Sequence, residues 1–189
     1  YFSTRNRKYD IIVSEPSNPW VSGVSSLFTR EFYRHTKRYL KPGGVLVQWF
    51  QLYEIDPSLV GSVLLSLGAE FPDYVIYMAT ESDLLIVAGD PETLTRPLTD
   101  VTKIPGLSDE LQRIHVNTLG DIQLRRLGGK AALDPFFRSY KVPGNSDFQP
   151  YLDLNAAKYR FLQRYAGEVT EIDSASGIPV LSMLEGRVS

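Results

Sequence analysis

Hydrophobic residues in this chain fall into short runs separated by turn-forming residues, a pattern typical of a mixed α/β protein. Residues 9–14 form an apolar run with two isoleucines and a valine, which predicts a buried strand. Runs at residues 45–52, 74–79 and 84–88 predict three more strands. Only the polar turn at residues 80–83 separates the last two, so we expect an antiparallel hairpin, because a short turn cannot connect parallel strands.

Helices are predicted in the two intervals between the first three strands. The first helix should begin at Ser25 or Ser26, because a serine can cap it. The Pro-Gly-Gly turn at residues 42–44 should end it. The second helix should begin with Asp56 as its cap and Pro57 at its first position, which is a strong start signal.

The predicted fold class is therefore α/β, with parallel strands that end in an antiparallel hairpin within residues 1–90. From about residue 90 the strand pattern fades and prolines interrupt a polar stretch. Short helices are predicted near residues 108–111, 118–127 and 150–165. We therefore expect residues 91–189 to form a mostly helical extension, with a loosely ordered tail after Asp173.

Composition narrows the classes of partner and chemistry. The hydrophobic fraction of 43% and the charged fraction of 22% are typical of a globular protein. No apolar run approaches the roughly 18 residues needed to cross a bilayer, and a net charge of −2 gives no general attraction for nucleic acid. With no cysteine and two histidines, the chain offers no thiolate or histidine-rich metal site. We expect no metal, no nucleic-acid partner and a cytoplasmic location.

Candidate chemistry lies where the first predicted strand ends. Residues 15–20 read Glu-Pro-Ser-Asn-Pro-Trp, and open α/β sheets bind ligands beyond the carboxyl ends of their strands. Glu15, Asn18 and Trp20 are therefore candidates for a site, together with Gln48 on the second strand. Each also has a structural alternative, since an acid or an amide can shape a turn and an aromatic ring can pack in the core.

Three ordered blocks of sequence resemble the spermidine synthase family. They are Tyr-Asp-Ile-Ile-Val-Ser-Glu-Pro-Ser-Asn-Pro at residues 9–19, Ser-Leu-Phe-Thr-Arg-Glu-Phe-Tyr at 26–33 and Leu-Lys-Pro-Gly-Gly-Val-Leu-Val-Gln at 40–48. The resemblance covers residues 1–90 and implies the C-terminal half of a Rossmann-like sheet of the class I AdoMet methyltransferase type. It implies a polyamine-type transferase that moves an aminopropyl group from decarboxylated AdoMet to a small-molecule amine.

The resemblance also assigns roles at the strand end. It makes Glu15 the catalytic base, lets Asn18 and Gln48 position the substrate, and places Trp20 against the substrate in the pocket. The family has two aspartates where this chain has Glu15 and Asn18. One carboxylate is therefore replaced by an uncharged amide, which reduces the attraction for a cationic diamine.

Cofactor contacts are implied at Pro19 and at Tyr1 and Phe2. The family's glycine-rich loop and the acidic residue that hold the nucleoside belong to its first half, and this chain has no such loop. We therefore expect a missing N-terminal half of the same polypeptide to supply them, and this fragment alone to be inactive. The initial residue is not methionine, which favours the same interpretation.

Larger relatives share the pattern Asn-x-Asp-x-x-Pro-x-Leu, which is found here at residues 145–152. Those relatives often have a membrane-embedded front half, so the parent of this chain could be attached to a membrane. A sheet that lacks its neighbouring strands would also have an exposed edge, and such edges promote association. A homo-oligomer is therefore a further expectation.

Two other functions stay open. Asn18, Pro19 and Trp20 are similar to the segment with which amino-group methyltransferases hold a target NH2 group, and this similarity predicts AdoMet-dependent N-methyl transfer. A non-catalytic domain that keeps the fold is the third alternative, which the missing half and the reduced charge favour.

Overall fold

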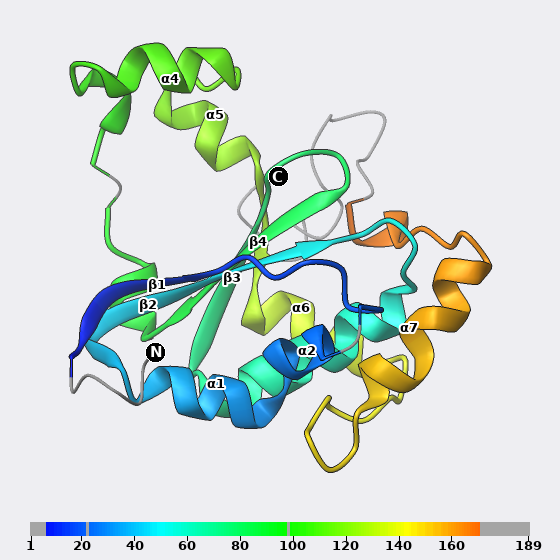
Figure 1. Ribbon diagram of the computed structural model, residues 1–189. Coiled ribbons are helices and arrows are strands. Elements are labelled where there is room, and N and C mark those ends of the chain that lie inside the picture. The colour runs from blue at the N-terminus through cyan, green and yellow to red at the C-terminus, as the bar shows by residue number, and fades with distance from the viewer. Residues whose placement is uncertain (1–6, 22, 98, 171–189) are drawn as a thin grey trace.

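The computed structural model describes residues 7–21, 23–97 and 99–170, and its centre is an open five-stranded sheet (Figure 1). The strand order is β1-β2-β4-β3-β5; β1 and β2 are parallel and the other neighbours are antiparallel. The strands are β1 (Tyr9–Ser14), β2 (Leu40–Gln51), β3 (Asp73–Met78), β4 (Asp83–Gly89) and β5 (Arg126–Gly129). The predicted α/β class, with parallel strands ending in an antiparallel hairpin, is confirmed at this level.

Helices connect the strands, and α1, α2, α6 and α7 gather on one side of the sheet, whereas α4 and α5 lie apart from them (Figure 1). The α-helices of the described ranges are α1 (Arg30–Lys37), α2 (Pro57–Glu70), α3 (Pro91–Leu94), α4 (Leu107–Arg113), α5 (Leu119–Leu124), α6 (Lys130–Arg138) and α7 (Tyr151–Phe161). Three short 3-10 helices accompany them, η2 (Val24–Phe28), η3 (Val101–Lys103) and η4 (Gly167–Thr170).

Helix α2 begins where the sequence predicted, with Asp56 as its cap and Pro57 at its first position. The side chain of Asp56 accepts a hydrogen bond from the backbone N–H of Ser58 at 3.0 Å, and Pro57 occupies the first helical position. An aspartate cap satisfies one of the N–H groups that the first turn leaves unpaired, and proline has no N–H to lose there. This element is confirmed.

The start of α1 differs from the prediction. Residues 24–28 form the 3-10 helix η2, and Thr29 caps α1 by accepting from the N–H of Phe32 at 3.3 Å. The Pro-Gly-Gly turn does not end a helix but lies within β2. Gly44 allows this, because a Cβ there would lie 3.0 Å from the carbonyl oxygen of Tyr9 in β1.

The sequence did not predict β5 or α6, and it placed a helix over residues 118–127. α5 ends at Leu124, and residues 126–129 instead pair with β3, where Gly128 lies opposite Ile76 and Gly129 opposite Val75. α6 contains Pro135, a residue that argues against a helix interior. Tertiary packing decides both elements, because the buried side chains of Leu127, Leu133 and Phe137 join the main core.

The main core contains residues from both predicted parts of the chain. Leu46, Leu64 and Ile76 come from residues 1–90, while Phe137 and Leu152 come from the later part, and all five are fully buried in one cluster. The predicted tail after Asp173 lies outside the described residues. Within the described ranges, none of the helices combines the length and apolar character needed to cross a membrane.

β1 is the edge strand on its side of the described sheet. Ile11 and Val13, which share one face of the strand, are 58% and 66% exposed. Ile12 on the opposite face is buried against the helices. Part of an apolar face of the described sheet is therefore exposed to solvent.

Candidate functional site at the carboxyl ends of β1 and β2

The loops that leave β1 and β2 meet in space. Ser14 at the end of β1 lies opposite Gln48 in the parallel register. Beyond this pair, the hydroxyl of Tyr53 donates to the Oδ1 atom of Asn18 at 3.2 Å. The rings of Trp20 and Tyr53 pack edge to face, with centroids 6.3 Å apart. The structure thus brings Asn18 and Trp20 together through Tyr53, which the sequence analysis missed.

Gln48 links the two strand ends from a fully buried position. Its Nε2 group donates to the carbonyl oxygens of Ser14 at 3.2 Å and Trp49 at 3.1 Å. Its Oε1 atom is buried and has no hydrogen-bond partner in the described part of the chain. The Nε2 group therefore holds the start of the loop after β1, and the Oε1 atom is an acceptor that the described residues do not use.

Gln51, the last residue of β2, is a second buried amide that the sequence analysis missed. It is 1% exposed, and neither Nε2 nor Oε1 has a hydrogen-bond partner within the described residues. A buried polar atom without a partner costs about 1–3 kcal/mol, and unpaired groups of this kind are typical of ligand-binding sites. A second glutamine at the end of the same strand is the sequence signal that could have revealed it.

α7 contributes a cationic group to this end of the sheet. The guanidinium carbon of Arg160 lies 5.4 Å from the centre of the Trp20 ring, and its Nε atom lies 3.8 Å from Oε2 of Glu54. The helix is held there because Leu152 and Ala156 are buried in the core and the N–H of Ala166, just beyond it, donates to the carbonyl of Leu52 at 2.9 Å. No sequence spacing could have linked Arg160 to Trp20.

A cavity of about 430 Å³ lies at this junction. It is lined by Trp20, Glu54, Ala157, Arg160, Phe161 and Gln163. The apolar surfaces come from the loop after β1 and from α7, and the two charged residues, Glu54 and Arg160, lie beside each other as an ion pair. The arrangement can hold a small molecule that has an apolar body and charged ends.

Glu15, the predicted base, does not line this cavity. Its side chain is exposed, and among the described residues it makes no hydrogen bond or ion pair. Pro19 is buried beneath the same loop, whereas Tyr1 and Phe2 lie outside the described residues. Beyond the strand end, Asn18 and Trp20 meet through Tyr53, while Gln48 is buried between the two strands and Glu15 lies on the solvent side of the loop.

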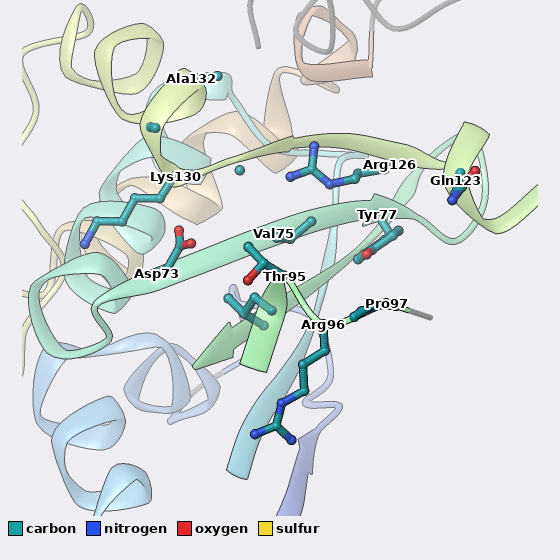
Figure 2. Close-up of a pocket in the computed structure, with 13 residues that line it drawn as sticks. Asp73, Val75, Tyr77, Thr95, Arg96, Pro97, Gln123, Arg126, Lys130 and Ala132 are labelled. Atoms are coloured by element: carbon teal, nitrogen blue, oxygen red, sulfur yellow. The ribbon is translucent and has the colours of Figure 1, made fainter. Parts of the chain in front are cut away.

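A larger cavity of about 660 Å³ lies away from this site, between β3, β5, α3 and the start of α6 (Figure 2). The fold itself uses the ammonium group of one of its charged residues, Lys130. The ammonium group of Lys130 donates to the carbonyl oxygens of Gly68 at 2.7 Å and of Phe71 and Pro72 at 3.2 Å. Arg96 extends in a different direction (Figure 2). We therefore place the candidate site at the strand ends rather than in this larger space.

The described residues contain no group of three or more histidine, aspartate or glutamate side chains arranged to hold a metal ion. The amino-acid sequence matches no model of a known protein family and no curated protein.

Proposed function

We propose that this chain is the acceptor-binding part of a spermidine synthase-like transferase, which moves an aminopropyl group from decarboxylated AdoMet to an amine. The observation that carries the proposal is the contact of Asn18 and Trp20 through Tyr53 beyond the carboxyl ends of two parallel strands, where Gln48 lies opposite Ser14. Open α/β sheets bind their ligands at this place. A partial Rossmann-like sheet of the methyltransferase type is part of the same proposal.

The reaction needs a base as well as substrate contacts. The amine nitrogen attacks the propyl carbon next to the sulfonium, so an N–C bond forms while the C–S bond breaks and its electron pair stays on sulfur. An alkyl amine has a pKa of about 10.4, like lysine, and arrives protonated. Glu15 is the group that we assign to take this proton. The amide oxygen of Asn18 accepts a hydrogen bond from the nitrogen, and Gln48 positions the loop that carries Asn18 through its bond to Ser14.

The nucleoside needs contacts that the described residues do not make by themselves. Of the three residues that the resemblance assigns to it, only Pro19 belongs to the described ranges, and Pro19 is buried. The proposal therefore gives the sulfonium-binding role to another part of the same polypeptide. In this proposal the complete polypeptide, and not the 189-residue chain alone, is the active species.

Methyl transfer from AdoMet to an amino group is the second candidate, and one contact favours it. The Tyr53 hydroxyl fixes the carbonyl end of the Asn18 amide, and the Trp20 ring lies beside Tyr53. A carbonyl oxygen has two lone pairs, so Asn18 can accept from Tyr53 and from a target NH2 group at the same time. An aromatic ring beside that amide could stack on a planar amine.

Calorimetric titration of the complete polypeptide with AdoMet and with decarboxylated AdoMet separates these functions. Tighter binding of the decarboxylated form supports aminopropyl transfer, and tighter binding of AdoMet supports methyl transfer. If the polypeptide binds neither sulfonium compound, both transferase proposals fail and the non-catalytic alternative remains.

The role of Glu15 has its own test. In the complete polypeptide, Glu15→Gln should lower the turnover number by about two orders of magnitude or more, because the amide cannot accept the proton. Glu92→Gln, at an exposed carboxylate in α3, is the matched control and should leave turnover unchanged. Equal turnover in both variants and in the native protein would remove Glu15 from the mechanism.

A further inference from the structure

The cavity between Trp20 and α7 contains one negative and one positive group. Glu54 and Arg160 lie beside each other in its lining, with side chains that are 36% and 58% exposed. Their closest approach is 3.8 Å, longer than the 2.7–2.9 Å of a charge-assisted hydrogen bond. The pair is therefore loose, and each partner can still form hydrogen bonds with a ligand.

Arg160 is well placed to bind an anionic group. Within the described residues its side chain makes no hydrogen bond, and its guanidinium lies over the Trp20 ring at 5.4 Å. A guanidinium beside an aromatic face is held in one orientation. Its remaining N–H groups form a planar fork that fits a carboxylate with two parallel hydrogen bonds.

Two of the residues that line the cavity have the same unusual backbone conformation. Glu54 and Gln163, which both line it, have φ angles of 54° and 48°. Residues other than glycine rarely adopt this left-handed conformation, and it is found preferentially at functional sites. Two segments that are distant in sequence thus adopt this conformation where they line the same cavity.

We propose that this cavity selects an acceptor amine that also carries a carboxylate, that is, a zwitterionic amine such as an amino acid. This inference rests on the proposed transferase function and deepens it. The carboxylate of the ligand pairs with Arg160, an ammonium group pairs with Glu54, and the carbon chain lies against Trp20 and Phe161. A simple diamine would bring a second positive charge towards Arg160, which like-charge repulsion disfavours.

Ornithine and 1,4-diaminobutane form a matched pair of probes, because they differ by one carboxylate. We expect calorimetric titration of the complete polypeptide to show ornithine binding about tenfold or more tightly, as the gain of one charge-assisted pair predicts. Arg160→Gln should abolish this preference. Arg164→Gln, at an exposed arginine outside the cavity lining, is the control and should preserve it.

The inference is overturned if the diamine binds as tightly as ornithine, if neither amine binds, or if Arg160→Gln leaves the preference intact. The titrations with AdoMet and decarboxylated AdoMet show whether the transferase proposal has failed as well. Transfer to the diamine without a preference for ornithine would overturn the inference alone. A preference that depends on Arg160, without binding of either sulfonium compound, would support the cavity chemistry and overturn the transferase function.

Discussion

Asn145 and Gln51 both bury an amide side chain, but their surroundings differ completely. The Nδ2 group of Asn145 donates to the carbonyl oxygens of Ser25 at 3.3 Å and Phe28 at 3.1 Å, and its Oδ1 atom accepts from the N–H of Leu152 at 3.0 Å. Gln51 has no hydrogen-bond partner for either amide atom in the described part of the chain. The Asn145 amide therefore forms hydrogen bonds within the fold through both of its polar atoms, whereas the Gln51 amide forms none with the described residues.

The backbone of Asn145 has the same structural role as its side chain. Its carbonyl oxygen accepts from the N–H of Arg30 at 3.0 Å and from the hydroxyl of Ser66 at 2.8 Å, and its N–H donates to the carbonyl of Ser62 at 3.2 Å. One residue thus joins η2, α1, α2 and α7. We interpret satisfied buried polar groups as architecture, and unsatisfied ones at the strand ends as candidates for binding.

The largest expected effect is at Asn145. Asn145→Ala should lower the free energy of unfolding by about 3 kcal/mol or more, because three buried backbone groups lose their partner at once. Asn155→Ala is the control, since that amide makes one hydrogen bond, to the carbonyl of Tyr151 at 2.8 Å, and should cost about 1 kcal/mol. Denaturant unfolding followed by circular dichroism measures both. Equal losses in the two variants would remove the special role of Asn145.

A smaller effect should separate the two glutamines of β2. Gln48→Leu should cost about 1–2 kcal/mol, because the carbonyl oxygens of Ser14 and Trp49 lose a donor. Gln51→Leu should leave the midpoint of thermal unfolding unchanged or raise it, because an apolar side chain replaces an amide without partners. A loss at Gln51 as large as that at Gln48 would show that the fold uses the Gln51 amide after all.

The smallest expected effect concerns stability at low pH. Arg30, whose backbone N–H donates to the carbonyl of Asn145, also forms an ion pair with Glu70 through its side chain. Burial acts to raise the pKa of Glu70, but hydrogen bonds from Arg34 and Arg30, at 2.9 Å and 2.6 Å, hold this pKa below its usual value. A carboxyl group with a lowered pKa stabilises the fold above its unfolded-state pKa of about 4.3, and this contribution disappears as the pH falls through the folded-state value.

Glu70→Gln should therefore reduce the loss of unfolding free energy between pH 7 and pH 3. The difference from the native protein should be below about 1 kcal/mol, as for other partly exposed ion pairs. Chemical denaturation at a series of pH values measures it, with Glu92→Gln as the control. Parallel pH profiles for the native protein and Glu70→Gln would contradict the assignment.

The sequence predicted the first half of the fold well because local signals and tertiary structure agree there. The position of β1, the Asp56-Pro57 helix start and the β3–β4 hairpin each follow from neighbouring residues. The prediction that β1 is buried was wrong, because Ile11 and Val13 lie exposed on one face of this edge strand. β5 was missed because its two glycines have no strand preference, and only pairing with β3 makes a strand of them.

The residues of the candidate site also fall into two groups, those that a local sequence pattern locates and those that only tertiary packing brings together. Asn18, Trp20 and Gln48 could be proposed from the sequence because they lie on a loop or strand whose end the hydrophobic pattern locates. Arg160 was missed because it is 140 residues from Trp20 along the chain, and only the packing of α7 on α2 brings the two together. Contacts between distant segments leave no local mark in one amino-acid sequence.

The position of β1 at the border of the sheet has a consequence for Glu15. Within the described sheet, β1 has a neighbouring strand on one side only, and an edge strand can pair with a further strand. If a further strand paired there in the parallel direction, its C-terminal end would lie beside Glu15, as Gln48 of β2 lies beside Ser14 of β1. The carboxylate would then change from an outward-facing group into one enclosed between two chain segments, so the addition of a single strand would complete its environment.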